Sequence, residues 1–291
     1  MEKIVLNKIN RNEIADLIRS AIDEDLGGYG DITSKLIIPP AHHSSAYIAC
    51  KEKNGAVLSG IDVSSYVFEE LSPFIKIEKL REDGQNLECF DIICRLNGPT
   101  RAMLAAERLA LNFLQHMSGI ATVTASYASI ASKYNARIAD TRKTKPCLRK
   151  LEKYAVLCGG GFNHRFGLFD GILIKDNHIA AAGSIKKAVD RARINMPHHL
   201  KIEVEVKDFD ELRDAVSCRA DIIMLDNMDI ENIKKAVKII KDKLQDTCMI
   251  EVSGGVNITN LEDICKAGVD IISAGAITHS APAADFSLEF E

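Results

Sequence analysis

The pattern of hydrophobic and polar positions changes in character along the chain. Residues 11–24 have the periodicity of an amphipathic helix, and residues 46–60 alternate around Asn54-Gly55, a dipeptide typical of β-hairpin turns. Residues 74–96 contain further short strand-like runs. We therefore expect a mixed α/β region here, in which the segment 46–60 folds back on itself.

A long helical pattern follows, from about Arg101 to Lys133, with a break expected near Ser118-Gly119. Amphipathic stretches further on, such as 184–193 and 232–244, alternate with short apolar runs that end in polar or glycine clusters. There are six of these runs, at residues 136–143, 171–177, 201–206, 221–227, 249–255 and 270–276. The alternation, at roughly 20–35 residues per unit, is the βα rhythm of a parallel sheet.

This rhythm fits either an open sheet or a barrel. No GxGxxG turn of the kind that marks a dinucleotide-binding sheet is present, which favours a barrel. Because six βα units fall short of the eight of a closed barrel, we expect the barrel to be incomplete.

Composition narrows the function classes. The chain has 46% hydrophobic and 27% charged residues and a net charge of −4, which is ordinary for a globular protein and unfavourable for general nucleic-acid binding. The eight cysteines form no CxxC pair, so reduced thiols are expected rather than a disulfide framework or a zinc site. The first 20 residues lack a signal peptide's apolar core, and no stretch reaches the roughly 18 apolar residues of a membrane span. We expect a cytoplasmic protein with no membrane or nucleic-acid partner.

The candidate chemistry lies where the predicted strands end. In a βα barrel the active site is built at the carboxyl ends of the strands. The ends of the six predicted strands carry the following polar residues and glycines: Asp140, Arg142, Lys143, Lys175, Asp176, Glu205, Asp226, Ser253, Gly254, Gly255 and Gly275. Any one of them could simply be an exposed polar residue, but six consecutive strands that end in this way indicate a site.

Three kinds of group meet on this rim. The cations Arg142, Lys143, His164, Arg165 and Lys175 repel one another and therefore indicate an anionic ligand, unless they pair with nearby acids. The glycine-rich turns after the last two strands are typical of phosphate binding, although an ordinary tight turn looks the same.

Acidic side chains form the third kind of group. Glu203 and Glu205 share one face of their strand, and Asp226 ends the next. Glu205 and Asp226 could bind Mg²⁺ or stabilise a cationic sugar carbon, or they could balance the neighbouring cations.

Long motifs carry a resemblance to a known family. They are EDLGGYGDITS (24–34), GPTRAMLAAERLALNFLQHMSGIAT (98–122), the block from Asp140 to Ile179 beginning DTRKTKPCLRKLEKY, the pair EVEV and MLDN (203–227), and SGGVN with SAGAITHSAP (253–282). In order and over nearly the whole chain, they resemble the decarboxylating quinolinate (nicotinate-nucleotide) phosphoribosyltransferases, a type II phosphoribosyltransferase family.

The resemblance implies a fold and a reaction. The fold is an N-terminal α/β sandwich (1–115, joined by the C-terminal segment 271–291) plus an incomplete parallel α/β barrel (116–270). The activity is that of a nicotinate-nucleotide diphosphorylase (carboxylating), a pentosyltransferase of NAD biosynthesis. It transfers phosphoribosyl from phosphoribosyl pyrophosphate to quinolinate with Mg²⁺ as cofactor, giving nicotinate mononucleotide, pyrophosphate and CO₂. A homodimer or larger homo-oligomer with a shared active site is also implied.

The resemblance assigns roles residue by residue. The implied substrate-binding residues are Arg142, His164, Arg165, Lys143 and Lys175, with Arg101 supplied by the neighbouring subunit. The implied catalytic residues are Glu205, Asp226, Lys143 and Lys175, with Glu205 and Asp226 holding the metal directly or through water. Ser253, Gly254, Gly255 and Gly275 match the 5′-phosphate cradle, with His279 nearby. Lys145 and Cys147 stand where the family pattern has a threonine and a glycine.

Alternative functions remain at this point. A nicotinate phosphoribosyltransferase would share the fold type but bind a monocarboxylate and use ATP. A Schiff-base aldolase would use Lys175 as its nucleophile. A sensor of phosphorylated ligands would have no need of Glu205 and Asp226.

Overall fold

A computed structural model describes residues 7–291; residues 1–6, which begin the segment without a signal-peptide core, lie outside the described residues. The chain divides into two compact units. The first unit comprises Met1–Ala125, Lys145–Gly160 and Ser280–Glu291, and the second comprises Ser126–Thr144 and Gly161–His279. The chain therefore passes between the units four times, and the segment 145–160 belongs to the first unit although it lies between two barrel strands in sequence.

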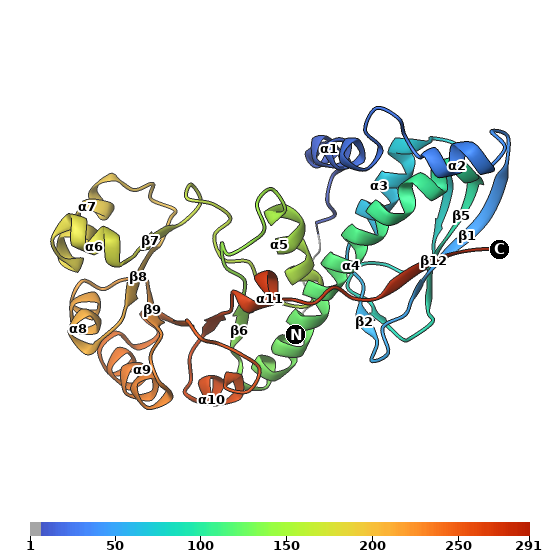
Figure 1. The fold of residues 1–291 in the computed structure, drawn as a ribbon. Coiled ribbons are helices and arrows are strands. Elements are labelled where there is room, and N and C mark those ends of the chain that lie inside the picture. The colour runs from blue at the N-terminus through green and yellow to red at the C-terminus, as the bar shows by residue number, and fades with distance from the viewer. Residues whose placement is uncertain (1–6) are drawn as a thin grey trace. The chain divides into compact units, whose positions relative to one another are not determined.

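The first unit is built around a four-stranded antiparallel sheet of order β12-β1-β5-β3 (Figure 1). Its elements are η1 (Arg11–Glu13), α1 (Ala15–Leu26), α2 (Ile32–Ile37), β1 (His43–Cys50), β2 (Ala56–Val57), α3 (Ile61–Leu71), β3 (Lys76–Lys79), β4 (Asn86–Leu87), β5 (Ile92–Pro99), most of α4 (Thr100–Ala131), α5 (Arg149–Cys158) and β12 (Phe286–Phe290). The last strand pairs with β1, with Ile48 opposite Leu288, and both side chains are buried. The last strand, β12, is thus an edge strand of the sheet that contains β1.

The predicted hairpin around Asn54-Gly55 is wrong. The chain does turn there, and Gly55 has a φ of +75°, but β1 pairs with β12 and β5, whereas β2 pairs with β4. A Cβ on Gly55 would lie 2.4 Å from the Leu87 carbonyl oxygen. Glycine is therefore required here for a close approach to β4 as well as for the turn, which the local pattern did not reveal.

The predicted break in the long helix is also wrong, because α4 runs without interruption through Ser118 and Gly119. The Ser118 hydroxyl accepts from the Ser59 N–H at 3.0 Å and donates to the Ser59 carbonyl at 3.1 Å. A Cβ on Gly119 would lie 2.0 Å from the carbonyl oxygen of Pro282. The two small residues mark the place where other backbone segments cross the helix closely, not a place where the helix ends.

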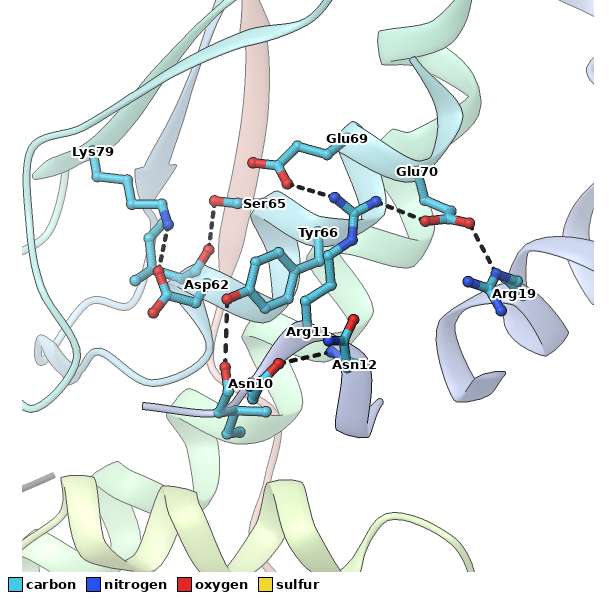
Figure 2. A network of polar contacts seen from close by, with 12 residues as sticks. Asn10, Arg11, Asn12, Arg19, Asp62, Ser65, Tyr66, Glu69, Glu70 and Lys79 are labelled. Atoms are coloured by element: carbon cyan, nitrogen blue, oxygen red, sulfur yellow. Dashed lines mark hydrogen bonds and ion pairs between the residues drawn. The ribbon is translucent and has the colours of Figure 1, made fainter. Parts of the chain in front are cut away.

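A polar network ties the N-terminal segment to α3 (Figure 2). The Arg11 guanidinium lies between Glu69 at 3.2 Å and Glu70 at 2.7 Å, and Arg19 on α1 donates to Glu70 at 3.0 Å. Because one arginine bridges two carboxylates and a second shares one of them, this network contributes more than an isolated exposed ion pair.

The second unit contains a six-stranded parallel sheet of order β6-β11-β10-β9-β8-β7. Its strands are β6 (Arg137–Ala139), β7 (Ile172–Ile174), β8 (Ile202–Val206), β9 (Ile222–Asp226), β10 (Met249–Ser253) and β11 (Ile271–Ser273). The other elements are η2 (Ser132–Tyr134), α6 (Asp176–Ala182), α7 (Ile185–Asn195), α8 (Phe209–Ser217), α9 (Ile230–Leu244), η3 (Gln245–Thr247), α10 (Leu261–Lys266) and α11 (Ala276–His279). The six predicted strands are confirmed, as are the helices expected within 184–193 and 232–244.

The sheet curves with α6 to α10 on its outer side (Figure 1). Within the described residues β6 and β7 are its two edges and do not pair with each other, so the barrel is incomplete, as predicted. No helix in residues 7–291 is both long enough and apolar enough to cross a membrane; the 32-residue α4 has the length but not the apolarity.

Replacing Gly119 by alanine is expected to destabilise the first unit by roughly 2 kcal/mol or more, since the added methyl overlaps a backbone oxygen that cannot rotate away. Gly28 is the matched control, because a Cβ there meets nothing within 4 Å. Urea denaturation of both variants measures the effect, and equal free energies of unfolding for Gly119→Ala and Gly28→Ala would contradict it.

Candidate active site

A cavity of about 720 Å³ lies at the carboxyl ends of the parallel strands, and its lining residues all belong to the second unit. Every strand contributes, because in a parallel sheet all carboxyl ends face the same rim. The predicted site residues that line it are Arg142, Lys143, His164, Arg165, Lys175, Glu205, Asp226, Ser253, Gly254, Gly255, Gly275 and His279. Arg101 lies on α4 in the first unit, where its guanidinium donates to the carbonyls of Ile38 at 2.7 Å and Lys35 at 3.0 Å.

The loop after β6 is held in place by threonines. The Thr141 hydroxyl accepts from the Lys143 N–H at 3.0 Å, and the Thr278 hydroxyl donates to the Lys143 carbonyl at 2.9 Å. The backbone between Arg142 and Lys143 is thereby fixed from two sides, so both cations belong to the pocket lining instead of one pointing away. The sequence analysis did not single out Thr141, whose short polar side chain just after a strand was the available signal.

Two arginines come close together in the pocket. The Arg165 guanidinium donates to the Gly171 carbonyl at 3.0 Å, and burial first, then the neighbouring Arg142 charge, lower the pKa of Arg165. Glu203 and Asp170 act in the opposite direction. Arg165 is partly buried and Arg142 is exposed at the pocket. Two neighbouring guanidinium groups are stabilised by a bound anion, and they match a ligand with two carboxylates.

The turn after β10 is a glycine cradle. Gly254 and Gly255 have φ values of +88° and +63°, a conformation that other residues adopt only with strain. A Cβ on Gly254 would also lie 2.2 Å from the Asn227 amide oxygen. Successive glycines leave backbone N–H groups open to an anion, which suits a phosphate.

The two acids of the pocket occupy adjacent strands. Glu205 accepts from the Lys175 ammonium, and Asp226 accepts from the Asn227 amide at 2.8 Å. Within residues 7–291 each carboxylate is bonded through one oxygen, which leaves the other for a ligand or for water bound to a metal. The donor set is all oxygen, which fits Mg²⁺.

A buried polar cluster lies among the inner-face residues of the same unit. Its members are His164, Glu203 on β8 and Glu251 on β10, whose nearest ligand atoms all lie within 4.8 Å of one another. Glu203 and Glu251 are 5% and 1% exposed. The sequence analysis missed Glu251, for which the available signal was an acid at the centre of the apolar run MIEVS.

Lys145 and Cys147, the two residues that differ from the family pattern, both lie in the first unit. Lys145 donates its N–H to the buried Glu152 carboxylate at 3.3 Å, and its ammonium lies 3.3 Å from His116 Nδ1. Cys147 has a φ of +64°, in the left-handed region that glycine adopts without strain. Backbone conformation therefore accounts for a glycine at position 147 in the pattern.

Comparisons with known proteins point to one family over most of the chain. Residues 31–118 match the family model "Quinolinate phosphoribosyl transferase, N-terminal domain", and residues 120–289 match the corresponding C-terminal domain. A probable nicotinate-nucleotide pyrophosphorylase (carboxylating) from Methanocaldococcus jannaschii is 45% identical, covering 94% of this chain and 95% of its own. One from Bacillus subtilis is 38% identical, with 97% and 94% covered.

Solved structures of the same family superpose closely on this chain. The nicotinate-nucleotide pyrophosphorylase from Francisella tularensis superposes with a TM-score of 0.90 at 41% identity, covering 98% of this chain and 99% of its own. Human nicotinic acid phosphoribosyltransferase, at 13% identity and a TM-score of 0.59 over 94% of this chain and 73% of its own, shares the fold alone.

The buried Glu251 predicts a pH-dependent stability. Burial, and then the neighbouring Glu203 charge, raise the pKa of Glu251 to about 7. Between the unfolded pKa of about 4.3 and this value the folded state binds the extra proton, so the wild type loses stability as pH rises through that window. Glu251→Gln removes this loss.

We therefore expect Glu251→Gln to match the wild type near pH 5 and to exceed it by roughly 1–3 kcal/mol at pH 8. Free energies of unfolding from urea titrations at both pH values measure the difference. A difference that does not change with pH would contradict the burial argument.

Proposed function

The chain belongs to the quinolinate phosphoribosyltransferase family, and we propose that the pocket of its second unit carries out the family's reaction. Quinolinate and phosphoribosyl pyrophosphate react there to give nicotinate mononucleotide, pyrophosphate and CO₂, a pentosyl transfer in NAD biosynthesis. The observation that carries the proposal is the close Arg142–Arg165 pair in a pocket that also contains the glycine cradle.

The cations bind the pyridine dicarboxylate. Arg142 and Arg165 present planar forks suited to carboxylates, and Lys143 and Lys175 supply further charge. His164 lines the same part of the pocket. A ligand with one carboxylate would leave a partly buried cation without an anion, which is costly and gives selectivity for two carboxylates.

The glycine cradle binds the 5′-phosphate of the sugar. Ser253 at the end of β10, Gly254 and Gly255 after it, and Gly275 after β11 provide backbone that a phosphate can approach closely, with His279 beside Gly275. Asp226 on β9 and Glu205 on β8 follow the cradle strands in the sheet order and line the same pocket, and we assign them to the ribose. They are also the residues that would hold Mg²⁺, whose charge would help pyrophosphate to leave.

The residues of the chain account for the chemistry in two stages. As pyrophosphate departs, the anomeric carbon becomes cationic, and the carboxylate of Glu205 or Asp226 stabilises this charge. The pyridine nitrogen, oriented by the arginines, then forms the bond to that carbon. The resulting pyridinium accepts the electron pair left when the 2-carboxylate departs as CO₂.

The other functions considered from sequence are less consistent with the site. Lys175 donates to Glu205, and an ammonium held by a carboxylate is not the neutral amine that a Schiff base requires. A nicotinate phosphoribosyltransferase has one substrate carboxylate to bind, and a sensor gains nothing from Glu205 and Asp226.

The assembly we propose is a homodimer or larger homo-oligomer in which Arg101 serves a neighbouring copy's pocket. Apolar side chains on and near α2 are strongly exposed: Tyr29 is 81% exposed, Leu36 80% and Ile37 69%. Arg101 donates to the backbone of this same helix and of Ile38. A patch of this kind is typical of a protein interface, and docking of α2 would carry Arg101 with it. A cytoplasmic location is also proposed, in keeping with eight free thiols.

Arg142→Ala is expected to lower kcat/KM for quinolinate by roughly 10²–10³-fold, because a substrate carboxylate loses its guanidinium partner. Arg213→Ala is the matched control, since Arg213 is exposed on α8 and pairs only locally with Asp210. The assay is CO₂ release from carboxyl-labelled quinolinate with phosphoribosyl pyrophosphate and Mg²⁺ and without ATP. Absence of release by the folded wild type, with turnover of nicotinate and ATP instead, would refute the assignment.

The shared site predicts complementation between two inactive variants. In a dimer of one Arg101→Ala chain and one Arg142→Ala chain, both defects fall in one site and the other site is intact. Refolding equal amounts of the two variants together makes about half of the dimers mixed. Activity is therefore expected to recover to about a quarter of the wild type. If Arg101 instead serves the pocket of its own chain, the mixture would stay inactive.

A further inference from the structure

Glu203 is buried, acts electrostatically on Arg165, and has no role in the reaction described above. It is on the inner face of β8, and Glu251 is on β10, with β9 between them in the sheet. Glu203 Oε2 is 3.1 Å from His164 Nε2, and Glu251 Oε1 is 3.6 Å from the same nitrogen. The imidazole therefore points into the barrel, toward two buried acids.

The hydrogen bonds of His164 fix its tautomer. Nδ1 accepts from the Arg165 N–H at 2.7 Å, and a nitrogen that accepts cannot also carry a proton. The ring proton is thus on Nε2, which donates to Glu203. The His164 N–H donates to Asp140 at 2.9 Å, and Asp140 is fully buried. Both the ring and the backbone of this residue are held by the protein.

These contacts favour a proton over a metal ion in the cluster. A histidine that ligates a metal through one nitrogen normally donates the other N–H to an acceptor. In His164, Nδ1 accepts from the Arg165 N–H and so carries no proton. A metal on Nε2 would therefore leave the imidazole with no N–H at all. Three ligand atoms lie close enough for a cation, but the hydrogen-bond pattern opposes one.

Glu251 is the second buried acid of the cluster. Its Oε1 is buried without a hydrogen-bond partner in the described residues, and burial, then Glu203, raise its pKa, which favours the protonated form. Glu203 and Asp170 raise the pKa of Arg165, against burial and the nearby Arg142, which lower it.

We propose that Glu203 is a positioning residue for dicarboxylate binding: by accepting the Nε2 proton it locks His164, and the locked ring orients the backbone and guanidinium of Arg165. The inference rests on the proposed function of the pocket. Arg142 and Arg165 then present their guanidinium groups to the substrate carboxylates in a fixed arrangement.

The kinetic test compares Glu203→Ala with Glu203→Gln, which keeps a carbonyl acceptor for Nε2–H. The alanine variant is expected to raise KM for quinolinate roughly 10–100-fold, while KM for phosphoribosyl pyrophosphate and kcat stay within about threefold. The glutamine variant should restore the quinolinate KM to within about threefold of the wild type, and Glu251→Gln should leave it unchanged. A wild-type KM in Glu203→Ala, or equal changes for both substrates, would overturn the proposal.

A measurement without substrates separates this inference from the proposed function. In ¹⁵N-histidine-labelled wild type, the His164 signals are those absent from His164→Gln. We expect a protonated Nε2 and an unprotonated Nδ1 at neutral pH, unaffected by Zn²⁺ added alone. A doubly protonated ring, a proton on Nδ1, or stoichiometric Zn²⁺ binding lost in Glu251→Gln would refute the positioning role. Failure of the wild type to release CO₂ would refute the proposed function and leave the tautomer result standing.

Discussion

Repulsion among like charges on one rim of a curved sheet is the constraint on which the site depends. Burial lowers the pKa of Arg165, and the Arg142 charge lowers it further. The protein offsets part of this lowering with Glu203, and the remainder is left for an anionic ligand. Under the proposed function, the clustered positive charges that are costly to bring together are also the source of affinity for the anionic substrates.

The parallel sheet makes this concentration of charge possible. All six strands deliver their carboxyl ends to the same rim, and curvature turns the inner-face side chains toward one another. Glu203 and Glu251 lie on strands that are not neighbours, yet both reach one imidazole nitrogen. A flat sheet would keep such side chains apart by about two strand spacings, close to 10 Å.

Residues that line the pocket are supported by hydrogen bonds from neighbouring residues. Thr141 and Thr278 hold the backbone of Lys143, and Asp140 holds that of His164. Such supports fix the geometry before substrate binds, so little of the binding energy is spent on ordering. Fold alone does not set the specificity, because the same architecture occurs with different substrate sites.

The sequence by itself determined the six strands, their parallel arrangement and the rim residues, because strand periodicity and strand-end chemistry are local properties of the chain. Only the tertiary structure decided what Gly55, Gly119 and Glu251 do. Gly55 lies against the backbone of Leu87, and Gly119 lies against the backbone of Pro282. Both contacts are with segments distant in sequence, so local patterns mistook these glycines for a hairpin turn and a helix break. In the sequence, Glu251 is a single acid within an apolar run. Folding buries it beside Glu203, and burial is the main reason that its pKa is raised.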